Sequence, residues 1–167
     1  PHLWIRRQRQ MCIRDRLEVL GPEPFDDWNA KIAAAKCRGK RSPIKTTLLD
    51  QRFVVGVGNI YACEALHNAG ISPTKLAAKL VTKSGKPTKA LERLVDEVKI
   101  VLKKAIAAGG STLNDFADVD GNLGYFSHHF TIYGREDQPC LKAGCSGTVE
   151  RIVQSNRSTF WCPRCQK

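Results

Sequence analysis

The sequence predicts a mainly α-helical domain over residues 17–110, a loop and connector over 111–130, and a small metal-binding β-hairpin over 131–167. Residues 88–108 carry apolar side chains at a helical period, which predicts a long amphipathic helix. Shorter segments before it are bounded by the glycines, prolines and capping residues typical of helix ends. Four of the seven cysteines crowd into the last 28 residues, which favours one metal module over a disulfide framework.

Charge points to a polyanionic partner. The 167 residues include 27 Lys and Arg against 16 Asp and Glu, a net charge of +11, as expected for a protein that binds nucleic acid or, less often, an anionic membrane surface. A hydrophobic content of 42% is typical of a folded chain rather than a disordered basic tail. No stretch approaches the ~18 apolar residues of a membrane span, and no secretory signal is visible. We therefore expect a cytoplasmic or nucleoid location and no membrane partner.

Residues 1–16 differ from the rest of the chain. They hold five arginines against one acid and show no sustained helical period and no turn that closes the segment. One interpretation is a disordered basic arm. The interpretation we favour is that the segment is foreign to the domain, a truncation junction or sequence artefact joined at about Leu17.

Helix signals begin after a Gly/Pro-rich turn at 21–24. Asp26 or Asp27 is placed to cap a helix that runs to about Lys36. A short helical turn is expected through Leu48 and Leu49. Between the two lies a basic loop, whose cations are Lys36, Arg38, Lys40, Arg41 and Lys45.

The segment VVGVGNIY is suited to phosphate binding. Gly56 and Gly58 let the backbone approach a ligand closely, and Asn59 is placed to cap a helix that stops at Gly70. The N-terminus of such a helix offers free N–H groups to a phosphate, and the side-chain amide of Asn59 can donate to the same group. A G-x-G element alone is common in tight turns. The neighbouring basic loop favours nucleic-acid binding over a merely solvated surface.

Three more elements precede the cysteines. A short helix is expected over 73–80, and the helix over 88–108 ends at Gly109–Gly110. Residues 111–126 are polar and turn-rich, which is typical of a long functional loop. Alternation over 125–133 predicts a strand.

The strongest motif is the spacing of Cys140, Cys145, Cys162 and Cys165. Two close cysteine pairs, separated by a segment able to fold back as a hairpin, supply four thiolates to a tetrahedral zinc ion. Four protein ligands leave no open position, so we expect one structural Zn²⁺. Strands are predicted over 147–153 and 158–161. So small a module lacks a core of its own, which couples its folding to metal binding.

Two other charged side chains, Arg157 and Glu64, are interpreted from their positions. Arg157 lies at the predicted hairpin tip, where a guanidinium can bind a phosphate bidentately. The alternative is a solvated turn arginine, which composition alone favours. Glu64 is interpreted as a helix-surface or capping carboxylate.

Together these residues resemble bacterial formamidopyrimidine-DNA glycosylases. The similarity runs from about Leu17 to Lys167 and includes LGPEPF at 20–25, IKTTLLDQRFVVGVGNIYACEAL at 44–66, GGSTLNDF at 109–116, GYF at 124–126 and the cysteine module. It implies a helix–two-turn–helix DNA-binding domain with a C-terminal zinc finger. The family also has an N-terminal β-sandwich catalytic domain, which we expect this chain to lack. The four-residue spacing of the first cysteine pair departs from the commoner two-residue form.

The resemblance implies base-excision repair of damaged double-stranded DNA by a monomeric enzyme. Such glycosylase/AP lyases flip out oxidised purines such as 8-oxoguanine and formamidopyrimidines, remove them, and nick the abasic site. Their nucleophile is an N-terminal proline followed by glutamate. The Pro1–His2 start does not match that pattern, so we predict that this chain is inactive alone.

The resemblance also assigns site residues. Asn59 matches a phosphate-contacting asparagine, and Lys45 and Lys40 match basic DNA-contacting positions. Arg157 matches the zinc-finger arginine that holds phosphate near the lesion and takes part in δ-elimination. Residues 111–126 resemble the loop that covers the extruded purine, which favours this family over the alternative, an endonuclease VIII-type enzyme for oxidised pyrimidines. A non-enzymatic DNA-binding module with the same elements is a third hypothesis.

Overall fold

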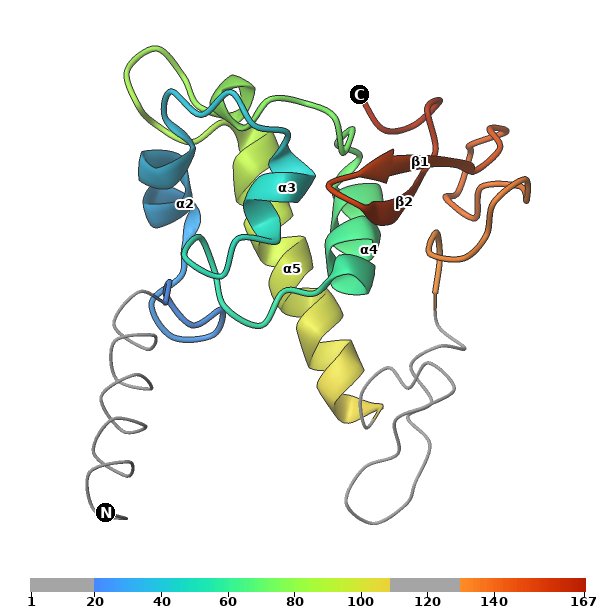
Figure 1. Ribbon diagram of the computed structural model, residues 1–167, viewed down its shortest axis with the longest axis horizontal. Coiled ribbons are helices and arrows are strands. Elements are labelled where there is room, and N and C mark those ends of the chain that lie inside the picture. The colour runs from blue at the N-terminus through green and yellow to red at the C-terminus, as the bar shows by residue number, and fades with distance from the viewer. Residues whose placement is uncertain (1–19, 109–129) are drawn as a thin grey trace, which may run out of the picture.

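The computed structural model describes residues 20–108 and 130–167 (Figure 1). The first range forms a helical part, and the second forms a small part built on a two-stranded hairpin that packs against one of the helices. The expectations for residues 1–16, for the helix end at Gly109–Gly110 and for the loop over 111–126 fall outside the described residues.

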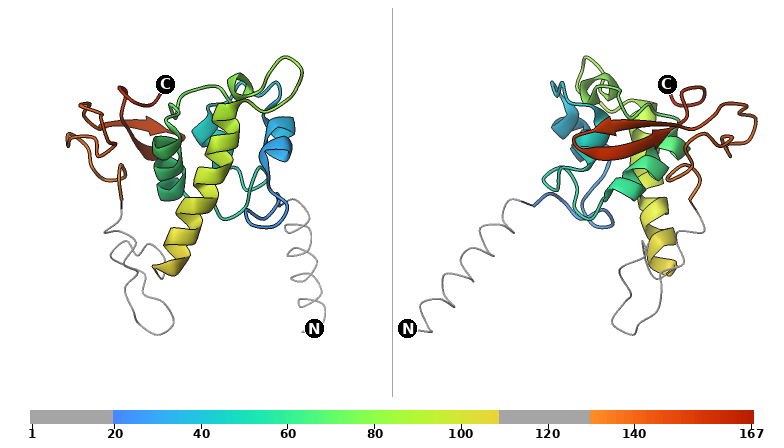
Figure 2. Two further views of the ribbon diagram at one scale, coloured as in Figure 1. Left: turned by 180° about the vertical axis from the view of Figure 1, so that it is seen from behind. Right: turned by 45° about the vertical axis from the view of Figure 1, so that its right-hand side comes forward.

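The helical part is arranged around one long helix that passes behind the others in Figure 1 and in front of them in the reverse view of Figure 2. Its core is built from apolar side chains of the helices and of the segments between them, including Trp28, Leu66, Leu94 and Val98. In the described residues, no helix is long and apolar enough to cross a membrane. The elements are α2 (Ala30–Cys37), α3 (Ile44–Leu48), α4 (Asn59–Ala69), the 3₁₀ helix η1 (Ala77–Leu80) and α5 (Lys89–Ala107).

Several predicted helix ends are confirmed, but the first cap and the start of the helix predicted over 73–80 are not, since that helix begins at Ala77. Residues 24–27 form a turn, so neither Asp26 nor Asp27 caps α2. The cap is Asn29, whose Oδ1 accepts from the N–H groups of Lys31 and Ile32 at 3.0 and 3.1 Å. Thr88 caps the N-terminus of α5. Gly70 ends α4 in the left-handed conformation that glycine adopts without strain.

The predicted hairpin is confirmed. Strands β1 (Glu150–Gln154) and β2 (Arg157–Trp161) pair antiparallel, with Gln154 opposite Arg157. The two residues between them, Ser155 and Asn156, have φ angles of 49° and 56°, as in the two-residue turns whose twist matches that of the strands. The strand predicted over 125–133 is wrong for 130–133, where the chain turns.

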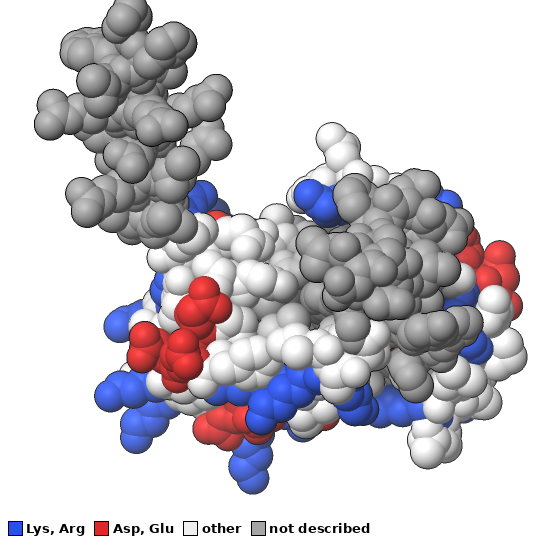
Figure 3. Space-filling view, turned by 90° about the horizontal axis from the view of Figure 1, so that it is seen from below, with Lys and Arg blue, Asp and Glu red and all other residues white. Residues whose placement is uncertain are grey.

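An apolar groove of about 400 Å³ opens near the C-terminal end of α5. Phe25 and Ile106, which line it, remain 43% and 69% exposed. Figure 3 views this end of the molecule from below and shows a mostly uncharged surface with acidic and basic side chains at its margin. Thus α5 buries one face along most of its length and leaves apolar side chains open at its end.

Candidate nucleic-acid interface and metal centre

The N-terminus of α4 follows the glycine-containing turn. Gly56 has a φ of 76°, which favours glycine, and its N–H donates to Oε1 of Gln51 at 3.0 Å. Gly58 is the N-cap residue, and no side chain caps the helix there. The prediction that Asn59 is the cap is therefore wrong, because Asn59 is the first helical residue. The uncapped N–H groups and the helix dipole make this end favourable for an anion.

The side chain of Asn59 joins three parts of the molecule. Its Oδ1 accepts from Nζ of Lys45 on α3 at 2.6 Å. Its Nδ2 donates to the backbone oxygen of Ser158 on β2 at 2.9 Å and makes a longer contact of 3.4 Å with the hydroxyl of Tyr133. We call this meeting point of α3, α4 and the hairpin the junction.

Lys45 lies beneath the junction rather than on its surface. The residue is 0% exposed, and besides Asn59 its Nζ donates to Oγ1 of Thr159 at 2.7 Å. Burial lowers the pKa of Lys45; the neighbouring Cys63 thiol opposes this shift, and the positive charge of Arg157 adds to it. A fully buried ammonium group has no free donor at the surface. In this structure Lys45 therefore stabilises the contact of the hairpin with the helices rather than offering an open DNA contact.

Arg157 lies at the hairpin tip, as the sequence predicted, and is exposed. It directly precedes Ser158, whose backbone oxygen accepts from Asn59, so its backbone lies beside the junction. No salt bridge found among residues 20–108 and 130–167 includes it. Lys40 lies elsewhere: its Nζ is 3.8 Å from Oδ2 of Asp50 and 5.8 Å from the ring centre of Phe53. The structure thus brings Lys45, Asn59 and Arg157 together and leaves Lys40 apart.

The four C-terminal cysteines are placed for one metal ion. Their Sγ atoms all lie within 4.8 Å of one another, with 3.8 Å between Cys140 and Cys165 and 3.7 Å between Cys145 and Cys162. A tetrahedral zinc ion with Zn–S bonds of about 2.3 Å separates its sulfurs by about 3.8 Å, so the residues fit this ion. Gly147 leaves the space open, because a Cβ there would lie 2.6 Å from Sγ of Cys162.

Glu64 ties the zinc-binding part to α4. Its carboxylate is 3% exposed and accepts from the backbone N–H groups of Thr131, Ile132 and Tyr133 at 2.9–3.1 Å, and from the Thr131 hydroxyl at 2.6 Å. The interpretation of Glu64 as a surface or N-terminal capping residue is therefore wrong. Because three successive N–H groups converge on one carboxylate, this stretch of chain turns rather than forming a strand.

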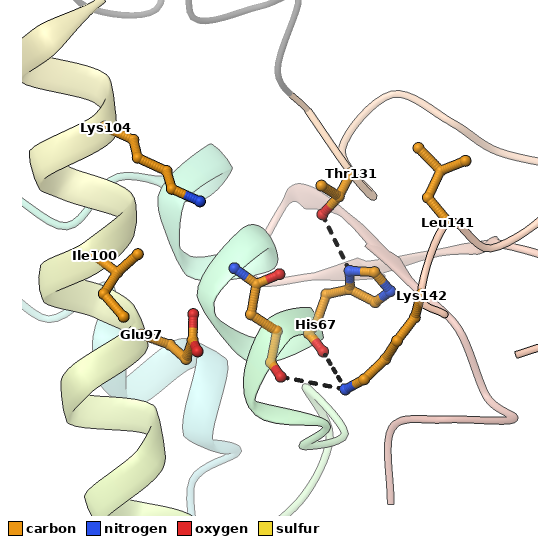
Figure 4. A pocket seen from close by; sticks show the side chains of 8 residues that line it. His67, Glu97, Ile100, Lys104, Thr131, Leu141 and Lys142 are labelled. Carbon is orange, nitrogen blue, oxygen red and sulfur yellow. Dashed lines mark hydrogen bonds between the residues drawn. The ribbon is translucent and has the colours of Figure 1, made fainter. Parts of the chain in front are cut away.

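His67, one turn further along α4, reaches the metal ligands. Its Nδ1 lies 3.1 Å from Oγ1 of Thr131, and its Nε2 lies 3.2 Å from Sγ of Cys140. A pocket of about 480 Å³ lies at the same end of α4 (Figure 4). Beside it, Lys142 donates to the backbone oxygens of His67 and Asn68. A cation at these carbonyls is favourable for the helix dipole. The last turn of α4 is thereby attached to the cysteine loop.

Known families match both parts of the chain. A family model described as "Formamidopyrimidine-DNA glycosylase H2TH domain" matches residues 20–117, more than half of the chain. The chain belongs to the formamidopyrimidine-DNA glycosylase family. A second model, "Zinc finger found in FPG and IleRS", matches residues 137–167 and agrees with the four-cysteine geometry, so the chain carries one structural zinc site.

Relatives agree with this family assignment. Proteins named formamidopyrimidine-DNA glycosylase from Rhodopseudomonas palustris (strain BisB18) and Sinorhizobium fredii are 53% and 54% identical over 152 and 149 residues. These matches cover 90% and 89% of this chain but 52% and 50% of the relatives, so the chain spans about half of their length.

Solved structures show the same fold. The MutM (Fpg) protein from Thermus thermophilus is 38% identical, with a TM-score of 0.78 over 90% of this chain and 55% of that one. A complex of Lactococcus lactis Fpg with DNA that contains an abasic site is 31% identical, with a TM-score of 0.80 over 95% of this chain and 56% of that one. The mainly helical domain followed by a zinc hairpin is thus confirmed.

Sequence reasoning missed several residues that build the site in this glycosylase-family chain. Tyr133 and Thr159 complete the junction, and Glu64 and His67 connect it to the zinc site. Tyr133 and Thr159 are far in the sequence from Glu64 and His67, and the four belong to no short motif. One available signal was the acid Glu64, which stands among the buried residues of α4.

Proposed function

We propose that this chain is the DNA-binding half of a bifunctional DNA glycosylase and AP lyase that removes oxidised purines. The observation that carries the proposal is the junction, where the hairpin that carries Arg157 contacts Asn59 at the uncapped N-terminus of α4, and Lys45 is buried beneath them. A phosphate at this point accepts from both the guanidinium and the helix N–H groups. The helices and the zinc hairpin then hold the same DNA strand.

Each junction residue has a distinct role in this proposal. Arg157 binds the phosphate directly and, by resemblance, takes part in δ-elimination. Asn59 offers the phosphate the N–H group that now makes its long contact of 3.4 Å with Tyr133, while its other bond keeps the hairpin in place. Lys45 fixes Asn59 from below. Lys40 stays a weaker proposal as a DNA contact, because Asp50 already lies beside it.

The kind of DNA is supported by the relatives. The Lactococcus lactis structures that resemble this chain hold DNA with an abasic site or with a Fapy-dG base. The sequence of residues 111–126 supports oxidised purines over the oxidised pyrimidines of the endonuclease VIII alternative. We propose further that the protein acts as a monomer in the bacterial cytoplasm, at the nucleoid, with domain limits at 17–110, 111–130 and 131–167.

The experiment is a binding and nicking assay with the zinc-loaded chain. We expect it to bind a duplex with an abasic-site analogue more tightly than an undamaged duplex, and to leave a duplex with one 8-oxoguanine uncut. Arg157→Ala should weaken binding about tenfold at unchanged zinc content, whereas Lys103→Ala, an exposed cation on the last turns of α5, should not. Equal binding of damaged and undamaged DNA would overturn the proposal. Cleavage by this chain alone would overturn the expectation that it is inactive.

A further inference from the structure

Two segments of the helical part carry only positively charged side chains among their Lys, Arg, Asp and Glu residues. Residues 28–49 and 65–91 contain no Asp or Glu, whereas both are rich in Lys and Arg. The described acids lie outside these segments, on the turn at 23–27, at Asp50, within α4 and α5, and in the hairpin part. The cations of the two segments are Lys31, Lys36, Arg38, Lys40, Arg41 and Lys45, then Lys75, Lys79, Lys83, Lys86 and Lys89.

The fold places these two segments against each other. The N–H groups of Ala77 and Ala78 donate to the backbone oxygens of Ser42 and Lys40 at 3.0 and 3.1 Å. The turn over 82–87 is closed by its own bonds, including one of 2.9 Å from the N–H of Thr82 to the oxygen of Lys86. Arg38 lies over this turn, with its guanidinium 3.7 Å from the position that a Cβ on Gly85 would take.

Five exposed cations therefore share one surface, which we call the basic face: Arg38, Arg41, Lys79, Lys83 and Lys86. The salt bridges found within 20–108 and 130–167 involve Asp50 or Glu136, and no member of the basic face takes part in them. Unpaired cations of one sign raise the local positive potential. The five are spread over the loop after α2, η1 and the turn over 82–87, an arrangement that suits an extended polyanion better than a small anion.

The basic face is continuous with the junction. The turn after α4 lies between them: the oxygen of Lys75 accepts from the N–H of Ile44 at 2.7 Å, and the oxygen of Pro73 accepts from Nε2 of Gln154 at 3.3 Å. In Figures 1 and 2 the turn over 82–87 and the hairpin both lie in the upper half of the molecule, with the start of α3 between them. A duplex held at the hairpin tip can thus extend along this surface.

We propose that the basic face binds the phosphate backbone of the duplex that flanks the lesion, as a second DNA contact besides the junction. This inference rests on the proposed function. Phosphate contacts of this kind add affinity without sequence preference. Each phosphate neutralised steepens the dependence of log K on log salt by about 0.9. The basic face therefore increases the length of duplex that the protein needs for full affinity.

The test is Lys83→Gln combined with Lys86→Gln, measured by fluorescence anisotropy on zinc-loaded protein over a range of salt concentrations. The matched control, Lys103→Gln with Lys104→Gln, removes two exposed cations from the other end of α5. On a duplex of about 30 base pairs with an abasic-site analogue, we expect the salt slope to fall by about 2 and the affinity at low salt to fall about tenfold. The control pair should match the unchanged protein.

The length of the duplex distinguishes the contribution of the basic face to binding from that of the junction. On a duplex trimmed to about 8 base pairs around the lesion, the two-lysine variant should bind like the unchanged protein, because the flank is missing. An unchanged salt slope on the long duplex, or an equal loss on both duplexes, would overturn the inference. A different result would contradict the proposed function: the unchanged protein would bind a short duplex with the abasic-site analogue no more tightly than an undamaged short duplex.

Discussion

Glu64→Gln offers a quantitative test of how the zinc-binding part is fixed to α4. The substitution keeps the shape of the side chain and removes its charge. A glutamine Oε1 can still accept from the N–H groups of Ile132 and Tyr133, which both contact Oε1 of Glu64. The amide NH₂ group then faces the N–H and hydroxyl of Thr131, two donors that at present share Oε2 at 2.9 and 2.6 Å.

The Thr131 hydroxyl therefore loses its acceptor, whereas the N–H of Thr131 keeps its second contact, 3.1 Å to Oε1. Such a loss costs about 1–3 kcal/mol, so the free energy of unfolding of the variant should be about 2 kcal/mol lower than that of the unchanged protein. Urea unfolding of the zinc-saturated chain, followed by tryptophan fluorescence, measures this difference. Glu97→Gln is the control, because Glu97 lines the neighbouring pocket and no hydrogen bond from it is found in the described residues. A loss below about 1 kcal/mol for Glu64→Gln, or an equal loss for the control, would refute the reasoning.

Two further predictions concern the cysteines. Removal of zinc by a chelator should unfold the hairpin part and abolish DNA binding while far-UV circular dichroism still shows the helices, since only the small part depends on the metal; binding that survives metal loss would contradict this. Burial raises the pKa of Cys37 from 9.0 to about 11. Between these two pH values the thiol is therefore neutral in the folded chain and ionised in the unfolded chain. Folding stability should therefore fall by roughly 1.4 kcal/mol per pH unit between these values. Cys37→Ala should remove this component, and an unchanged alkaline profile would argue against it.

The elements that the sequence predicted well are those with a strong local signal. The helix predicted over 88–108 is α5, Lys89–Ala107, because its apolar stripe and the Thr88 cap both act within one segment. The hairpin follows from a two-residue turn between short strands, and the zinc site from the cysteine spacing. In each case the residues that decide the structure are neighbours in the sequence or belong to one motif.

Apart from the cap of α2, which is Asn29 rather than Asp26 or Asp27, the misses involve contacts between distant segments. Lys45 looked like a surface cation of a basic loop, but the hairpin covers it completely. Asn59 looked like a cap, but its side chain is used by Lys45 and Ser158. Residues 130–133 looked like a strand, but the buried carboxylate of Glu64 takes their N–H groups. Local patterns cannot show such contacts, because each depends on how the hairpin packs against α4.

A double-mutant cycle tests most directly whether the junction binds one phosphate. The affinity for an abasic-analogue duplex is measured for the zinc-loaded chain, for Asn59→Ala, for Arg157→Ala and for the double variant. We predict that each single change weakens binding about tenfold. The loss of binding free energy in the double variant should be smaller than the sum of the two single losses by at least about 1 kcal/mol. All four proteins should keep their zinc. Additive losses, or an affinity that neither change alters, would contradict the account.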